Sequence, residues 1–353
     1  LPRLGPPEID GVTVTGVHFL GQVGGKVDAL TGSGAFTLAD LAADGVAANG
    51  VALDATFGLD GETVRFDLKG KAAGLLADRL DLATDQGVAF DLAGVLEGQE
   101  ATLSRFVLTG PVVEAKASGT ASLADGPLAL TYQVRIPDIA PVAAAYDAKA
   151  AGRVVSEGNL SGTLAAPRLD AFTAAEQLAM DGQAFGDVRI QHDVVVAEAV
   201  SGTVTVDAAT KPYGKLKAAT DLVLDGQTLT LTKLQADGMG VRVRSPKPLA
   251  IDLEKTLIDG RIAWSAGNLA SLARLAGAPM AGMAAGSVVF KPQQGRQNLT
   301  VDAKLERGKV GDAAVSLLTV KAAIRDALGR VPGVDASVHG ETITAGDIEI
   351  TPV

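Results

Sequence analysis

Short runs in which apolar and polar residues alternate recur along the whole chain. For example, Val51, Leu53 and Phe57 alternate with Asp54, and the run 64–70 repeats the pattern. A period of two is typical of a β-strand with one apolar and one polar side. The pattern predicts a mainly β protein with roughly 25 strands of about 5–8 residues. The apolar side of so many strands has to be hidden from water, either in a packed core or along a groove.

Asp-Gly pairs separate many of these runs. An Asp-Gly pair between alternating runs indicates a tight hairpin, because both central residues of such a turn take positive φ. Neighbouring strands are therefore predicted to be antiparallel and to pair in sequence order. The pairs lie at 10–11, 44–45, 60–61, 125–126, 181–182, 225–226, 237–238 and 259–260.

Two segments break the period of two and predict short helices, near 138–150 and 268–277. Asp138 and Asn268 are suitable N-cap residues. The two segments lie about 130 residues apart, and a strand with a leading glycine follows each, which indicates a long-period repeat. We expect one continuous β-rich rod without a linker. Its approximate modules are 11–101, 102–227 and 228–353, although Ala- and Gly-rich composition alone could produce the similarity.

Charge and composition exclude several classes of function. The 353 residues include 41 acidic and 31 basic side chains, for a net charge of −10. This balance disfavours binding to nucleic acid or to an anionic membrane surface. The absence of cysteine excludes disulfides and Cys metal sites. No apolar run approaches the length of a membrane-spanning helix, and the first residues do not resemble a signal peptide. We expect any anchor or export signal to lie outside the chain.

Candidate catalytic chemistry is absent from the sequence. The three histidines, His18, His192 and His339, lie in separate strands or turns. The Gly-rich run 21–30 lacks the glycine spacing and the Ser or Thr of a phosphate-binding loop. We therefore expect no enzyme activity, no cofactor and no metal.

The apolar positions carry few aromatic side chains, with one Trp, three Tyr and nine Phe in the chain. This disfavours the aromatic girdles of a membrane barrel and a base-stacking surface. Val, Leu, Ile, Ala and Phe suit acyl chains, which need only a dry surface without hydrogen bonds. The core of an ordinary β-sandwich would give the same pattern.

Residues 11–351 resemble the AsmA-like superfamily, and its TamB branch in particular. The strand texture carries the resemblance, together with the phrase at 158–171 and the short helix at 268–279 that leads directly into a strand with a leading glycine. The resemblance implies a β-taco, an elongated antiparallel sheet curled into a U-shaped apolar groove. It implies a periplasmic location and transfer of phospholipid between inner and outer membranes. We expect the inner-membrane anchor and any contact with the outer-membrane partner TamA to use regions outside this chain.

Strand parity, combined with this resemblance, predicts which side chains line the groove. They are Val51, Leu53, Phe57, Val64, Phe66, Leu68, Val88, Phe90, Leu92, Val188, Ile190, Val194, Val196, Leu222, Leu224, Ile262, Trp264, Val288, Phe290, Leu299 and Val301. The leading hypothesis is a non-enzymatic conduit that shields phospholipid acyl chains. A second hypothesis is a scaffold or chaperone that assembles outer-membrane proteins or autotransporters by strand addition, with TamA. A third is a parallel β-helix adhesin, which the Asp-Gly hairpins oppose.

Overall fold

The chain is mainly β, as the alternation predicts. A computed structural model describes residues 12–43, 45–124, 126–210, 214–273, 279–310, 313–345 and 348–350. Of these residues, 76% lie in strands and 3% in helices. The chain divides into two compact units, residues 1–191 (unit 1) and residues 192–353 (unit 2). The three predicted modules do not coincide with these units and stay a prediction.

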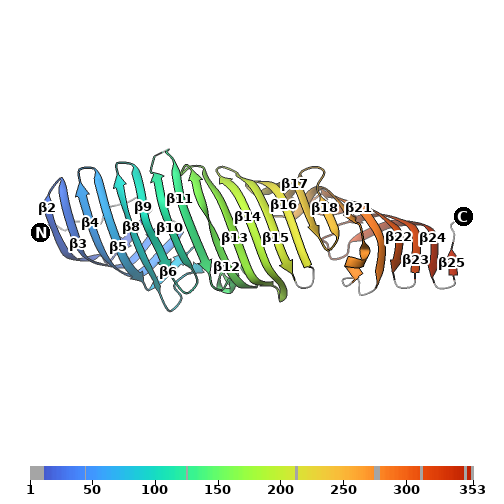
Figure 1. Ribbon diagram of the computed structural model, residues 1–353, viewed down its shortest axis with the longest axis horizontal. Coiled ribbons are helices and arrows are strands. Elements are labelled where there is room, and N and C mark those ends of the chain that lie inside the picture. Colours follow the sequence, from blue (N-terminus) through green and yellow to red (C-terminus); the bar gives the residue numbers. More distant parts are fainter. Residues whose placement is uncertain are drawn as a thin grey trace. The chain divides into compact units, whose positions relative to one another are not determined.

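Unit 1 is an antiparallel ladder with one short helix, α1 (Ala140–Ala145), between its last strands. The strands are β1 (Thr13–Thr15), β2 (His18–Lys26), β3 (Ala29–Ala43), β4 (Val46–Asp60), β5 (Thr63–Ala72), β6 (Gly74–Ala77), β7 (Leu80–Asp81), β8 (Val88–Glu97), β9 (Glu100–Thr109), β10 (Glu114–Ser122), β11 (Leu128–Ile136), β12 (Ala150–Gly162) and β13 (Pro167–Met180). Figure 1 shows β3, β4, β5 and β8–β13 side by side. β5 pairs directly with β8, so β6 and β7 stand outside the main ladder. Strand β14 (Gln183–Val196) crosses the boundary between the units.

Unit 2 repeats the ladder architecture with a 3₁₀ helix, η1 (Leu269–Leu272). Its strands are β15 (Val200–Thr210), β16 (Gly214–Asp225), β17 (Thr228–Gly238), β18 (Val241–Arg244), β19 (Leu249–Asp252), β20 (Leu257–Ala266), β21 (Met280–Gln293), β22 (Arg296–Val310), β23 (Ala313–Arg325), β24 (Gly333–Ala345) and β25 (Ile348–Ile350). β18 and β19 together take the place of one strand, because each pairs with both β17 and β20. From β20 onward, each strand pairs with the next in the sequence.

The Asp-Gly pairs that the structure describes in full occupy four kinds of position. At 181–182 they are the two residues between β13 and β14, with φ of 49° and 78°, as predicted. At 60–61 and 225–226, the aspartate ends a strand and the glycine begins the turn. At 237–238 both residues end β17. The turn predicted at 259–260 is wrong, because both residues lie inside β20.

A close neighbour explains why position 260, inside β20, is a glycine. A Cβ at this position would lie 2.6 Å from Leu249 Cδ2, so the glycine makes room for that buried leucine. The pairs at 10–11, 44–45 and 125–126 include residues outside those that the structure describes.

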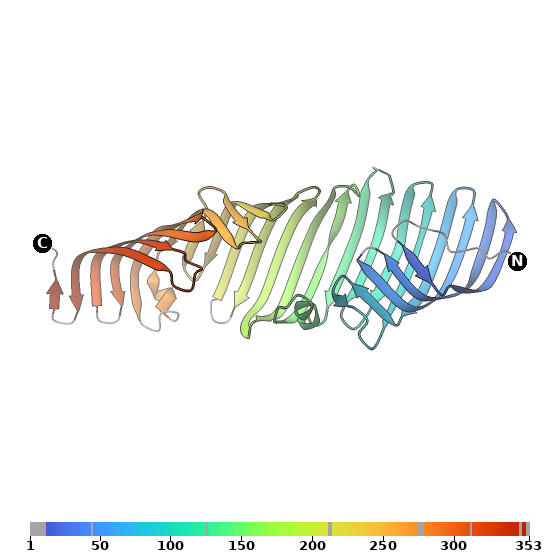
Figure 2. The ribbon, with the colours of Figure 1, turned by 180° about the vertical axis from the view of Figure 1, so that it is seen from behind.

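Many strands are longer than predicted, and β3, β4 and β22 each have 15 residues. The reason is that glycines and bulges bend a strand without ending it. In β4, Gly50 has φ of 55°, and the pairing with β3 skips both Gly50 and Ala39. The first part of β4 pairs with β6, and the part after Gly50 pairs with β5. Seen from behind in Figure 2, blue strands form a second layer at this end of unit 1.

The first predicted helix, α1, is shorter than predicted. In α1 the Asp138 Oδ1 accepts a hydrogen bond from Ala140 N at 3.0 Å, although Ile139 occupies the N-cap. In η1 Asn268 is the N-cap, as predicted, and its Oδ1 accepts from Ala270 N at 2.9 Å. Residues 274–278, part of the second predicted helix, lie outside the described residues. No helix in the described ranges is long and apolar enough to cross a membrane.

Candidate functional site

The apolar side chains of unit 1 form rows across its strands. Residues that pair directly in an antiparallel ladder point to the same side of the sheet. Phe57 on β4 pairs with Phe66 on β5. Leu68 on β5 pairs with Leu92 on β8, which pairs with Phe106 on β9. These five side chains are half-buried. They form one apolar surface, and we call this group the open lane.

The register places all nine predicted lining residues of β4, β5 and β8 on this apolar side. They are Val51, Leu53, Phe57, Val64, Phe66, Leu68, Val88, Phe90 and Leu92. Val51 and Val88 are buried, with 6% and 3% of their surface exposed, and the other seven are half-buried. In β14, Val188, Ile190 and Val194 are half-buried and Val196 is 42% exposed.

Unit 2 has an apolar side of the same kind. Ile262 pairs with Val288, which pairs with Val301, so three strands contribute to one row. Every predicted lining residue on β16 and on β20–β22 is half-buried. They are Leu222, Leu224, Ile262, Trp264, Val288, Phe290, Leu299 and Val301.

Aromatic rings on the apolar side lie against glycines of the neighbouring strand. The pairs are Phe57 with Gly32, Phe66 with Gly94, Phe90 with Gly70 and Trp264 with Gly286. A Cβ added at Gly94 would lie 2.8 Å from Phe66 Cζ, and one at Gly286 would lie 3.0 Å from Trp264 Cζ2. The ring therefore occupies the space that a side chain opposite it would fill. In each pair the ring covers the backbone of the glycine, so the apolar surface is shallow at that point.

The apolar side is not filled as a sandwich core would be. Among the described residues, no large side chain is fully buried, and seven of the fourteen buried hydrophobic residues are alanines. None of the fourteen is aromatic. An ordinary core of this many strands would bury its Phe, Leu and Trp side chains at near-crystalline packing density. The rows instead remain partly accessible along both units.

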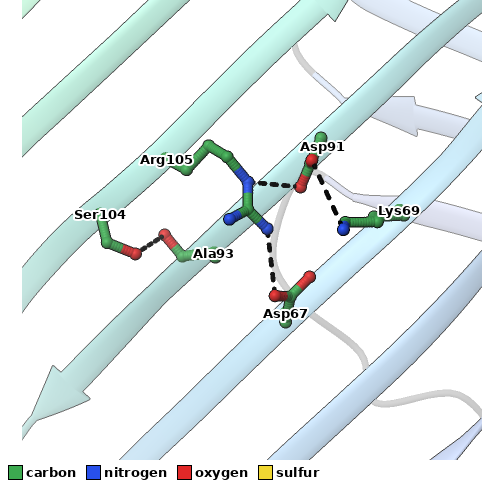
Figure 3. Close-up of polar contacts among 6 residues, drawn as sticks. All are labelled: Asp67, Lys69, Asp91, Ala93, Ser104 and Arg105. Carbon is green, nitrogen blue, oxygen red and sulfur yellow. Dashed lines mark hydrogen bonds and ion pairs between the residues drawn. The ribbon is translucent and has the colours of Figure 1, made fainter.

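The opposite side of the unit 1 ladder carries charges that pair across strands (Figure 3). Arg105 on β9 lies between two carboxylates, with its Nε 2.7 Å from Asp91 Oδ1 and its Nη2 3.0 Å from Asp67 Oδ2. Lys69 Nζ is 3.9 Å from Asp91 Oδ2. The hydrogen bond to Asp91, followed by that to Asp67, raises the pKa of the Arg105 guanidinium. These charges make the side of the ladder opposite the apolar rows polar.

We expect Arg105→Gln to lower the thermal midpoint of unit 1 slightly at low salt. The substitution leaves Asp67 and Asp91 without their shared cation, but all three groups are partly exposed, and solvent screens their interaction. The difference from the parent protein should shrink toward zero at about 1 M salt, where screening is strong. Melting curves at two salt concentrations test this, and a difference that salt does not reduce would contradict a mainly electrostatic role.

Other polar features of the molecule have structural explanations. A shallow hollow between β10 and β13 is lined by side chains that include Arg135 and Arg153, which pair with Glu114 at 3.8 Å and Glu176 at 3.4 Å. The three histidines lie in β2, β14 and β24. In the described part of the chain, no three His, Asp or Glu side chains gather as a metal site.

The structure adds apolar residues that strand parity did not identify. Leu103 and Phe106 on β9 both face the apolar side, because they pair with Gly94 and Leu92 on β8. They are three residues apart, which strict alternation assigns to opposite sides. A bulge between Ala93 and Gly94 shifts the register and returns both to the same side. The pairing passes over Ser104, and the alternation in the sequence gives no signal of this irregularity.

No protein-family model matches the chain, and no curated protein or solved structure is significantly similar to it. The candidate site therefore rests on the geometry of the two apolar sides.

Proposed function

We propose that the chain is a non-enzymatic conduit whose apolar sides bind the acyl chains of phospholipid. One observation carries this proposal: rows of large apolar side chains stay half-exposed on many successive strands, with no large side chain fully buried in the described residues. The resemblance of the sequence to the TamB branch supports a groove, a periplasmic location and transfer between the inner and outer membranes.

The energetics of acyl chains favour such a surface. Each CH₂ group of an acyl chain that is removed from water contributes about 0.8 kcal/mol to the free energy of binding. The half-exposed apolar side chains of the protein contribute about 25 cal/mol more for each Å² that the ligand covers. The phenylalanine rings that lie over glycines offer no hydrogen-bonding group, so acyl tails can slide over them without breaking polar contacts. The charged residues on the opposite side of the unit 1 sheet offer acyl tails no such gain.

A second candidate function, a scaffold that accepts polypeptide strands, is favoured by β2. All nine residues of β2 are exposed, and among the described residues it pairs only with β3. An open edge can add a strand from another polypeptide. A contact with the partner TamA would belong to this scaffold function. The two functions differ in cargo: extractable phospholipid in purified protein supports the conduit, and bound peptide without lipid supports the scaffold.

Trp264, the single tryptophan of the chain, tests the conduit directly. It is half-buried on the apolar side of unit 2, against Gly286. We expect phospholipid with brominated acyl chains to quench its fluorescence, because bromine quenches only at close range. The control moves the indole to the opposite side with Trp264→Phe and Ser265→Trp, since Ser265 is exposed. Equal quenching at both positions, or none at Trp264 when lipid is bound, would contradict binding to the apolar side.

A further inference from the structure

One segment of unit 1 leaves the ladder and covers part of its apolar side. β5 and β8 pair along their whole length, from Thr63 opposite Glu97 to Ala72 opposite Val88. A two-residue turn could join such strands. The chain instead inserts residues 73–87, which include β6 and β7. We call residues 74–87 the covering segment.

The covering segment packs on the apolar side at the end of the strands where β5 finishes. Ala83 is fully buried and lies in a cluster with Val51, Ala72 and Val88. Leu75 and Leu82 of the same segment pack against this cluster, and so do Leu38, Leu53, Phe90 and Leu108 of the ladder. Val51, Ala72 and Val88 lie on the same side of the ladder as the open lane. We call these three residues the covered lane.

Backbone and side-chain hydrogen bonds hold the covering segment in place. Asp81 Oδ1 accepts from Ala83 N at 3.0 Å and from Thr84 N at 2.9 Å. Leu82 N donates to Leu75 O at 2.8 Å, and Asp78 N donates to Gly45 O at 2.7 Å. β6 also pairs with the first part of β4. The segment is therefore built into the fold as a fixed wall.

The two lanes differ in accessibility although they share strands. Val51 and Val88 are buried, whereas Phe57, Phe66 and Leu92 are half-buried. On β5, Phe66 lies six residues from Ala72, which corresponds to about 20 Å along a strand. A tail on the open lane would need to displace Leu75, Leu82 and Ala83 to reach the covered lane.

We propose that the covering segment sets the boundary of the lipid-binding surface in unit 1, so that acyl chains occupy the open lane and are excluded from the covered lane. This inference rests on the proposed function and goes further, because it assigns which predicted lining residues contact lipid. Val51 and Val88 become core residues, and Phe90, a ladder residue that packs against the cluster, lies on the covered side of the boundary. Phe57, Phe66 and Leu92 form the contact surface.

Two tryptophan probes test this boundary in the full chain. Each is introduced after Trp264→Phe, one as Phe66→Trp in the open lane and one as Phe90→Trp against the cluster. Both parent residues are half-buried phenylalanines next to a glycine, so the substitutions are matched. With vesicles of brominated phosphatidylcholine, we expect the probe at 66 to lose fluorescence as strongly as Trp264 does in the parent protein. We expect the probe at 90 to keep its fluorescence.

The outcomes separate the boundary from the proposed function. Quenching at Trp264 and at both probes would overturn the boundary and leave the function standing. Quenching at Trp264 and at 90, but not at 66, would also overturn it. No quenching at any position would overturn the function itself, and with it the boundary.

A second variant removes the wall. Residues 74–86 are deleted in the Phe90→Trp protein, so that Ala73 and Gly87 form a two-residue turn between the paired Ala72 and Val88. In folded protein we expect the probe at 90 to become quenched, and an unquenched probe would overturn the boundary. If the deletion prevents folding, the comparison of the two probes in the intact chain decides alone.

Discussion

Phe66→Glu is expected to remove lipid from the open lane while leaving unit 2 able to bind it. Phe66 is half-buried between Phe57 on one side and Gly94 on the other. A carboxylate there would either face acyl tails or lose part of its hydration, and an unpaired charge in apolar surroundings costs several kcal/mol. Loss of 1.4 kcal/mol already weakens binding tenfold. We expect phospholipid per protein to fall in native mass spectrometry, with quenching of Trp264 by brominated lipid unchanged.

The matched control places the same charge on the opposite side of the ladder. Asp67 is unsuitable, because it already pairs with Arg105. Ala52 on β4 is exposed and pairs directly with Lys71, so Ala52→Glu adds a carboxylate opposite a cation. We expect this variant to carry as much lipid as the parent protein. If both variants lose lipid equally at equal folded content, the assignment of the apolar side is wrong.

The sequence was sufficient to predict the sides of the strands, because side-chain alternation is a local property of extended backbone. Phe57, Phe66 and Leu68 face the same side as predicted. The limits of strands were harder to predict. In the sequence, Gly50 indicates the end of a strand. In the structure it has φ of 55°, bends β4 and lets the strand continue.

The sequence could not reveal which apolar residues are covered. Val51 and Phe57 have the same parity and similar surroundings in the sequence, but only Val51 is buried, by Ala83 and its neighbours. That contact depends on a segment more than thirty residues later in the chain, which no local pattern encodes. For the same reason, the bulge that brings Leu103 and Phe106 to one side appears only once β8 and β9 are paired.

Gly70→Ala is expected to destabilise the ladder between β5 and β8. An added Cβ would lie 2.5 Å from the backbone oxygen of Ala52, 2.6 Å from Phe90 Cζ and 2.7 Å from Leu53 Cβ. The backbone oxygen belongs to the paired strand β4 and cannot move without disturbing the ladder. Overpacking of this kind typically costs 1–3 kcal/mol. Since Phe90 also packs on the cluster with Val51 and Val88, the covering segment should loosen as well.

Gly58→Ala provides the control, because it makes the same chemical change on β4 where nothing lies within 4 Å of the added Cβ. Alanine restricts the unfolded chain more than glycine does, so this variant should be neutral or more stable by up to about 1 kcal/mol. Hydrogen exchange read by mass spectrometry on peptides from β5 and β8 measures local opening in unit 1. Faster exchange is expected for Gly70→Ala and unchanged or slower exchange for Gly58→Ala. Equal exchange in the two variants would contradict the close approach of Ala52, Leu53 and Phe90 to Gly70, and with it the packing of this ring over the glycine.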